Sequence, residues 1–381
     1  MNPVPIRGKK RPPSIGSKGW LPLFGWVLAG AALLGLCLAI VALAVPIVAV
    51  LPGLLPREAA TTAPLIARRL VSDTLGLREA WSRSDLHLPS DLDPCVVAVD
   101  AGVAFVDFSP GSTEGDLTVL DVASGNVRWV SGGHSTLFSL GTDGAHVFVA
   151  SNERIRSYGM SDGALVWESE RLSAHADYLI APGISAYLEV FTSSDSLEGR
   201  VETIRRFNAD NGLLISRDSM DIPGQGALLT RSSGLNFWAE GEVLRATHRA
   251  TGSAAWEAIL PGTMRGWPVL AGGLIILRPG LPGPLVALNQ STGATEWVFD
   301  DPVASNLALR DRQVLALLSS GDLVAVDISS GTSAGVASFS QVADTGLSMD
   351  YTYCIALSGT RIFVYLGDTA QLIALEWVRD Q

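Results

Sequence analysis

The stretch that decides the fold runs from Leu285 to Trp297 and reads Leu-Val-Ala-Leu-Asn-Gln-Ser-Thr-Gly-Ala-Thr-Glu-Trp. Its first four residues are a short apolar run of strand length. The polar residues that follow end in Gly293, which can take a positive φ without steric cost, as a tight turn requires. The stretch therefore predicts a strand, a tight turn and a second strand that carries a large aromatic residue.

The same unit recurs along the chain. Further copies with both marks pair a turn glycine with a tryptophan four residues later: Gly125 with Trp129, Gly163 with Trp167, and Gly252 with Trp256. Two more copies, at Gly212 and Gly331, keep the glycine and lack the tryptophan. Successive glycines are 38, 49, 40, 41 and 38 residues apart. A period of about 40 residues built from strands is typical of the blades of a β-propeller.

The repeats predict an all-β propeller of about seven four-stranded blades, with eight as the alternative if residues 89–94 or the long third repeat hide strands. The last set of strands ends with Leu372–Leu375 and has no outermost strand before the chain stops. Near the N-terminus, Leu77–Ser82 reads as a lone outer strand. We expect this strand to complete the last blade, because an open ring would leave two exposed sheet edges.

Two details of the repeats lead to further expectations. The extra length of the third repeat falls in Thr192–Gly199, where Thr, Ser and Asp residues predict a loop at the tip of a hairpin. The repeat tryptophans are expected to face the next blade and to serve as packing residues, since a buried ring removes about 150–250 Å² from water.

The N-terminal part has a different composition. Residues from Trp20 to Pro56 include no charged side chain, and a helix of about 20 such residues spans a bilayer. Basic residues precede this segment, so the positive-inside rule leaves the N-terminus in the cytoplasm. A cleaved signal peptide is the alternative, although its apolar region would be only about 7–15 residues long. We expect a cytoplasmic tail (1–19), a single-pass cell-membrane anchor (20–56), a linker (57–75) and an extracytoplasmic propeller (76–381).

Charge and cysteine content limit the function further. The net charge is −11, although the first 56 residues carry only basic charges, and an acidic body argues against nucleic acid as a partner. Cys95 and Cys354 occupy equivalent positions in two blades, whereas Cys37 lies in the apolar segment. We expect two buried free thiols, because equivalent positions in adjacent blades are often too far apart to be bridged. A disulfide in an oxidising compartment is the alternative.

The repeats resemble the pyrroloquinoline-quinone-like (PQQ-like) propeller family, in which a strand, an Asp/Asn-x-x-Ser/Thr-Gly turn and a Trp-bearing strand mark each blade. The marks here are Asp121–Trp129, Gly163–Trp167, Gly252–Trp256 and Asn289–Trp297. The resemblance covers about residues 76–381 and implies the fold. Family members include quinoprotein dehydrogenases, a lipoprotein scaffold of outer-membrane protein assembly, and sensor domains attached to kinases. The adjacent cysteines and calcium ligands of the dehydrogenases have no counterpart in this sequence, so we expect no cofactor and no metal.

No catalytic motif or pair of metal ligands stands out. Polar and aromatic residues just before the predicted innermost strands would gather at one mouth of the central channel, where Arg and aromatic residues are common anchors of binding surfaces. These candidates are Tyr178, His175, Arg265, Trp267, Tyr351 and Tyr353, with His134 and Asp350 beside them. The alternative is that they are scattered loop residues.

These observations favour a membrane-anchored, extracytoplasmic propeller that serves as a protein-binding or scaffolding module, with another envelope protein as its partner. Two alternatives remain: a quinone-dependent dehydrogenase-like enzyme and a sensor domain that binds a small ligand.

Overall fold

The structure is a computed structural model that describes residues 68–89, 95–99, 101–108, 112, 114–135, 137–151, 154–172, 176–180, 187–196, 199–222, 227–340 and 353–378. All of them belong to one compact unit, residues 65–381. Their secondary structure consists of strands, and within these ranges no helix is long and apolar enough to cross a membrane. The predicted tail and anchor, and most of the predicted linker, lie outside the described residues.

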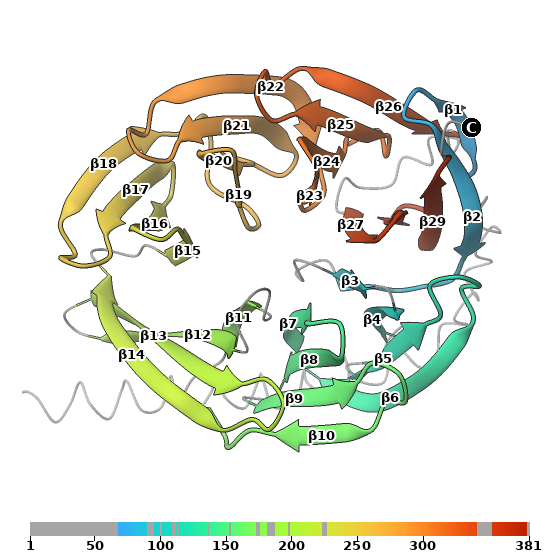
Figure 1. Cartoon of the computed structure of the whole chain (residues 1–381), viewed down its shortest axis with the longest axis horizontal. Helices are drawn as coiled ribbons and strands as arrows, with labels where there is room; N and C mark the ends of the chain where they lie inside the picture. Colours follow the sequence, from blue (N-terminus) through green and yellow to red (C-terminus); the bar gives the residue numbers. More distant parts are fainter. Residues whose placement is uncertain are drawn as a thin grey trace, which may run out of the picture. The chain divides into compact units, whose positions relative to one another are not determined.

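The strands form seven sheets around a common axis, six with four strands and one with five (Figure 1). We call the strands of a blade A to D from the axis outward. Blades 1 and 2 contain β3 (Val96–Val99), β4 (Gly102–Phe108), β5 (Glu114–Leu120) and β6 (Val127–Ser135), then β7 (Leu137–Thr142), β8 (His146–Ser151), β9 (Arg154–Gly159) and β10 (Leu165–Glu168). Blades 3 and 4 contain β11 (Ala176–Ile180), β12 (Tyr187–Ser196), β13 (Gly199–Asn208) and β14 (Leu214–Ile222), then β15 (Ala227–Arg231), β16 (Leu235–Glu240), β17 (Val243–His248) and β18 (Ala254–Ile259).

Blades 5 to 7 continue the same antiparallel pattern. They contain β19 (Val269–Ala271), β20 (Leu274–Leu277), β21 (Gly283–Asn289) and β22 (Thr295–Val303), then β23 (Ala308–Arg310), β24 (Gln313–Leu317), β25 (Leu323–Asp327) and β26 (Ser333–Phe339), and finally β27 (Tyr353–Ser358), β28 (Arg361–Leu366), β29 (Gln371–Trp377) and β2 (Leu77–Arg83). The count of seven blades is confirmed.

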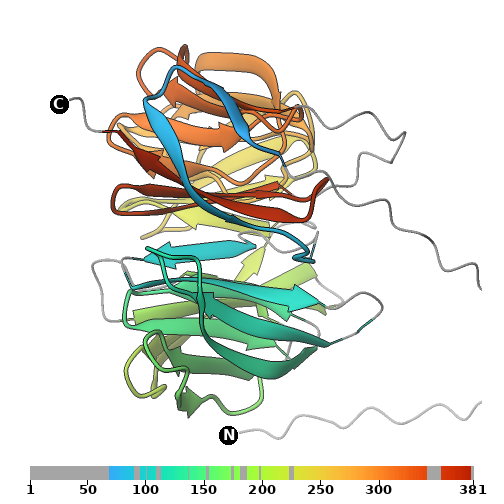
Figure 2. The same ribbon diagram turned by 90° about the vertical axis from the view of Figure 1, so that its right-hand side faces the viewer.

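The N-terminal strand closes the ring as the sequence predicts. β2 pairs antiparallel with β29, and Leu77 lies opposite Trp377 while Arg83 lies opposite Leu372. A further strand, β1 (Leu70–Asp73), was not expected; it falls within the predicted linker and pairs with β26 as a fifth strand of blade 6. Figure 2 shows β1 and β2, in blue, beside the outer strands of these last two blades.

The predicted loop in the third repeat is wrong. β12 runs on through Ser196 and β13 begins at Gly199, so the extra residues extend a hairpin in which Thr192 lies opposite Thr203. Thr and Ser suit an exposed strand as well as a turn, so composition did not separate the two structures here.

The tryptophans face the next blade, as predicted, and each covers that blade's turn glycine. A Cβ added to Gly331 would lie 2.6 Å from the Trp297 ring, and the Trp297 indole donates to the carbonyl of Ile328 at 2.7 Å. The same pair of contacts, a ring on the glycine and an indole N–H on the carbonyl three residues earlier, recurs with Trp81 on Gly125, Trp129 on Gly163, Trp167 on Gly212 and Trp256 on Gly293. The glycine and the tryptophan of the repeat are therefore two halves of a contact between neighbouring blades.

Because strands alternate in direction, the ring has two distinct faces. Strand A of each blade begins at one face, where the B–C connections such as Ser319–Asp322 and Gly367–Ala370 also lie. We call this the loop face. The A–B and C–D turns, including the turn glycines, lie at the opposite face, which we call the turn face.

Candidate functional site

The described candidates from the sequence differ in how much they are exposed. Arg265 is exposed, Trp267 is half-buried against side chains of blades 4 and 5, and Tyr353 is only 9% exposed at the start of β27. Tyr178 lies in β11, and His134 lies buried in β6, the outermost strand of blade 1. His175, Asp350 and Tyr351 lie outside the described residues.

Backbone contacts connect two of these residues across blades 5 to 7 on the loop face. The Arg265 amide donates to the carbonyl of Arg278 at 3.3 Å, and the Arg278 guanidinium donates to the carbonyl of Ser305. Ser305 in turn forms a parallel bridge with Tyr353. The arrangement joins Arg265 to Tyr353 through two residues that the sequence analysis did not select.

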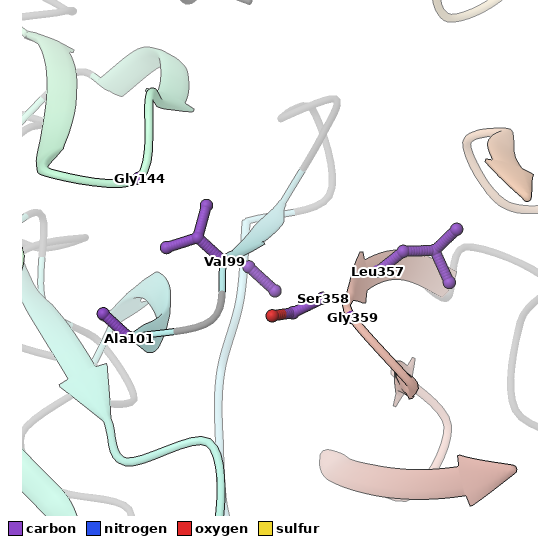
Figure 3. Close-up of a pocket in the computed structure, with 7 residues that line it drawn as sticks. Val99, Ala101, Gly144, Leu357, Ser358 and Gly359 are labelled. Carbon is purple, nitrogen blue, oxygen red and sulfur yellow. The ribbon is translucent and has the colours of Figure 1, made fainter.

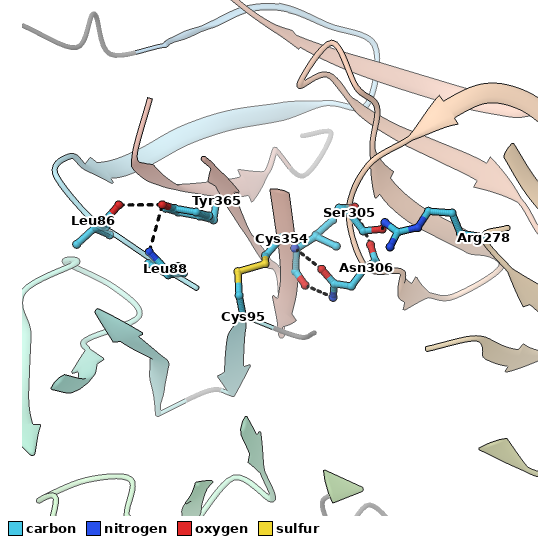
Figure 4. Close-up of a disulfide and its surroundings, with 9 residues drawn as sticks. Leu86, Leu88, Cys95, Arg278, Ser305, Asn306, Cys354 and Tyr365 are labelled. Carbon is cyan, nitrogen blue, oxygen red and sulfur yellow. Dashed lines mark hydrogen bonds between the residues drawn. A yellow bond between two sulfur atoms is a disulfide. The ribbon is translucent and has the colours of Figure 1, made fainter. Parts of the chain in front are cut away.

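Asn306 extends this connection, because its side chain pairs with the backbone of β27 as a neighbouring strand would. Its carboxamide donates to the carbonyl of Ile355 at 2.8 Å and accepts from the Ile355 amide at 2.8 Å (Figure 4). The neighbouring Ser305 hydroxyl accepts from the Leu317 amide at 2.8 Å. Polar groups near the axis are thus satisfied by the next blade, which fixes blades 6 and 7 relative to each other.

Cys95 and Cys354 form a disulfide between blades 1 and 7, so the expectation of free thiols is wrong (Figure 4). Their Cα atoms are 6.0 Å apart, within the usual range for a bridge. Equivalent positions approach so closely here because both cysteines lie at the start of innermost strands, where adjacent blades converge on the axis. The bridge joins the first and last blades of the ring.

The segment after β2 is fixed at the same contact between blades 1 and 7, which we call a seam, as we do for every contact between neighbouring blades. The Tyr365 hydroxyl donates to the carbonyl of Leu86 at 2.8 Å and accepts from the Leu88 amide at 3.4 Å. Burial raises the pKa of Tyr365 to about 12, so this hydroxyl remains a donor throughout the neutral range. Strand pairing, this tyrosine and the disulfide together hold the loop face rigid at the point where the ring closes.

The described chain begins at Arg68, which is buried at the loop face between blades 6 and 7. Its guanidinium donates to the carbonyl of Ser320 at 2.9 Å and pairs with the carboxylate of Asp368. Its backbone exchanges two hydrogen bonds with the side chain of Gln371, at 2.8 and 3.1 Å. A buried ion pair and backbone contacts therefore fix Arg68 at the loop face.

The turn face carries a hollow of about 500 Å³ between blades 1, 2 and 7. Figure 3 shows residues of β3 and β27 on opposite sides of it. Its lining is small and mostly apolar: Ala98, Val99, Ala101, Gly144, Leu357, Ser358 and Gly359. The size suits a small molecule, but side chains able to orient one are few.

His134 is a buried histidine between blades 1 and 2. It is 1% exposed and packs edge-on against Tyr158 with 5.7 Å between ring centres, and neither ring nitrogen has a hydrogen-bond partner among the described residues. Burial lowers its pKa to about 4, and the positive charge of Arg156 acts in the same direction. The residue is therefore a neutral core side chain at pH 7.

Within the described ranges, no three His, Cys, Asp or Glu side chains come close enough to hold a metal ion. Sequence reasoning missed Arg278 and Asn306 as site residues. Arg278 had one usable signal, a charged residue directly after an apolar strand and before Pro279 and Gly280. Asn306 had none, because its role depends on a strand that begins 47 residues later, at Tyr353.

Comparison with known proteins gives one family match. Residues 200–342, from β13 to just beyond β26, match the family model PQQ_2, described as outer membrane protein assembly factor BamB. No curated protein matches the chain. Among solved structures, BamB from Moraxella catarrhalis is similar with a TM-score of 0.45 and 15% identity, over 80% of this chain and 99% of that one. Over residues 200–342 the chain is therefore similar to this family, and its repeated strand–turn–tryptophan unit resembles that of PQQ-like β-propellers.

Proposed function

We propose that this chain is a membrane-anchored, extracytoplasmic propeller that binds and positions another envelope protein. The observation that carries the proposal is the match of residues 200–342 to a family model described as an outer membrane protein assembly factor. A closed ring with a covalent link between its first and last blades suits such a role, because a rigid surface loses little entropy on binding.

The disulfide supports the extracytoplasmic location. Structural disulfides persist in oxidising compartments and are rare in the reducing cytosol. Cys95 is 0% exposed and Cys354 is 3% exposed, so the bridge is part of the core rather than an accessible redox site.

The loop-face residues around Arg265 form the contact surface in this proposal, with Trp267 beside it and His175, Tyr178, Tyr351 and Tyr353 as further candidates. Arg265 is exposed and its backbone is fixed by Arg278, as a binding anchor requires.

The proposal is tested by cross-linking the full chain in its native membrane and identifying what is captured. We expect one envelope protein to be recovered, and an Arg265→Glu variant to reduce its yield more than Arg249→Glu on the turn face. Recovery of abundant background proteins alone, equally with wild type and both variants, would contradict the proposal.

A second candidate function, a sensor domain for a small ligand, is favoured by the hollow on the turn face. A thermal-shift screen of small apolar molecules addresses it. A molecule that stabilises the wild type should no longer stabilise Ala101→Leu, in which the larger side chain fills the hollow.

A further inference from the structure

The outer edges of the blades are protected to different degrees. Among the described strands, β26 is covered by β1, β10 has only 4 residues, β22 contains Pro302, and β6 contains Gly132 and Gly133. Such features discourage pairing with another strand. β2, β14 and β18 have none of them; β14 is the longest of the three, with 9 residues without proline or glycine, and no described strand pairs with its outer edge.

The start of β14 also exposes three consecutive apolar residues. Leu213, Leu214 and Ile215 are 66%, 53% and 48% exposed. On the neighbouring β10, Leu165 and Val166 are 54% and 44% exposed. An exposed strand edge that begins with apolar residues is a template for strand addition unless something covers it.

Blade 3 also lacks the inter-blade tryptophan contact. The row across β12, β13 and β14 that would end in tryptophan holds Glu189, Arg206 and Ser216. In blade 2 the corresponding row is Phe148, Ser157 and Trp167. Consequently Gly252 of blade 4 is uncovered, and an added Cβ would meet no described atom within 4 Å.

Blade 6 shows how this chain completes a blade that has no tryptophan. The position equivalent to tryptophan is Gly335, and a Cβ there would collide with the side chain of Leu75, just after β1. Thr74 continues the pairing beyond β1, accepting from the Val336 amide at 2.8 Å and donating to its carbonyl at 3.1 Å. A fifth strand thus replaces the missing aromatic ring.

Charge on β14 indicates what a fifth strand of blade 3 would carry. Arg217 lies directly opposite Arg205 on β13, and like charges in that position destabilise a sheet. Arg205 is 6% exposed, and its pKa is lowered by burial and by the nearby charge of Arg217. Arg217 is exposed and has no ion pair within the described ranges. An acidic residue on an added strand, opposite Arg217, would offset the charge of Arg217.

We propose that the edge of β14 accepts an extended segment of a partner protein as a fifth strand of blade 3, and that this segment carries an acidic residue next to apolar ones. The proposal deepens the protein-binding function proposed above and rests on it. The sequence of β1 and its flanks, Arg69–Leu75, has this composition and serves this purpose on blade 6.

The probe is a fluorescein-labelled peptide with the sequence Arg-Leu-Val-Ser-Asp-Thr-Leu, added to the full chain and followed by fluorescence anisotropy. We expect saturable binding, and hydrogen exchange should slow in residues 214–222 when the peptide is bound. No binding up to millimolar peptide, or protection elsewhere only, would overturn the proposal.

Two variants keep the test independent of folding. Arg217→Glu places a carboxylate opposite Arg205, so the protein stays folded, yet peptide binding should weaken about two- to fivefold. A peptide with Lys in place of Asp73 should restore binding to the Arg217→Glu variant and not to the wild type.

A second variant, Ile215→Lys, places a charge on the exposed edge and should weaken peptide binding about tenfold. Equal binding by wild type and both variants would refute the assignment to this edge.

The same variants separate this inference from the proposed function. If cross-linking in the membrane still captures the envelope protein with Ile215→Lys, the scaffold function stands and the β14 edge is not its contact. If the variant loses both the capture of the envelope protein and peptide binding, the scaffold function and the β14 contact are both supported.

Discussion

Blades 3 and 6 both lack the tryptophan that elsewhere covers the next blade's glycine, and they differ in what replaces it. Blade 6 gains β1 as a fifth strand and Leu75 against Gly335. In the part of the chain that the structure describes, no strand pairs with the outer strand of blade 3, and no side chain covers Gly252 of blade 4. In blade 6 the departure from the repeat marks a place where another segment of the chain contributes, and we propose that a partner contributes in the same way at blade 3.

The seam after blade 3 is held by charges in place of an aromatic ring. Glu189 accepts from Arg206 at 2.8 Å and also pairs with Arg231 of blade 4, whose guanidinium lies 5.5 Å from the centre of the Phe191 ring. Ion pairs that are partly solvated stabilise less than a buried indole does. The seam between blades 3 and 4 should therefore be the weaker one.

The largest expected effect comes from removing a ring at an intact seam. Trp297→Ala should lower the free energy of unfolding by about 3–5 kcal/mol, because the ring is 8% exposed and fills the space over Gly331. Urea unfolding measures the change. Ser216→Ala at the matching row of blade 3 is the control, and a loss of similar size there would erase the distinction between the two seams.

A second prediction concerns the seam between blades 1 and 2, which buries a neutral histidine. The pKa of His134 is about 4 in the folded chain and about 6.5 when unfolded, so the unfolded state binds more protons between these values. Stability should fall by roughly 3 kcal/mol as the pH drops from about 6.5 to 4. His134→Leu should remove this component, as urea titrations at several pH values would show; an unchanged pH profile would count against it.

The charged seam should respond to acid in a lower pH range. Burial alone would raise the pKa of Glu189, but Arg231 and Arg206 outweigh it and hold the pKa below its ordinary value. The stability this carboxylate contributes is present above its unfolded pKa of about 4.3 and is lost as the pH falls through the lower folded value. Glu189→Gln should cost about 1–3 kcal/mol at pH 7, and this cost should shrink as the pH falls below about 4. A cost that does not shrink in acid would argue against the ion pairs.

The smallest effect is expected where the chain itself supplies the fifth strand. Leu75 is half-buried, so Leu75→Ala should cost about 1–2 kcal/mol, less than a fully buried leucine. Val71→Ala, at a position 64% exposed on the same strand, is the matched control and should change little. Equal losses at the two positions would mean that Leu75 has no special place against Gly335.

The sequence was sufficient for the blades and for the closing strand, since both follow from apolar runs with a fixed period. β1 could not be predicted from it, because Leu70–Asp73 is a four-residue strand and its partner, β26, lies far away in the chain. The disulfide was misjudged for a geometric reason: blade spacing depends on distance from the axis, and the sequence does not give that distance. The contacts of Arg278 and Asn306 join residues far apart in the chain, so no local pattern reveals them.

The most direct test of this account is hydrogen exchange of the two outer strands in the isolated full chain. The account predicts slow exchange across residues 336–339 of β26, which β1 and Thr74 cover, and fast exchange of every second amide across residues 214–222 of β14. Slow exchange of all β14 amides without any partner would contradict it.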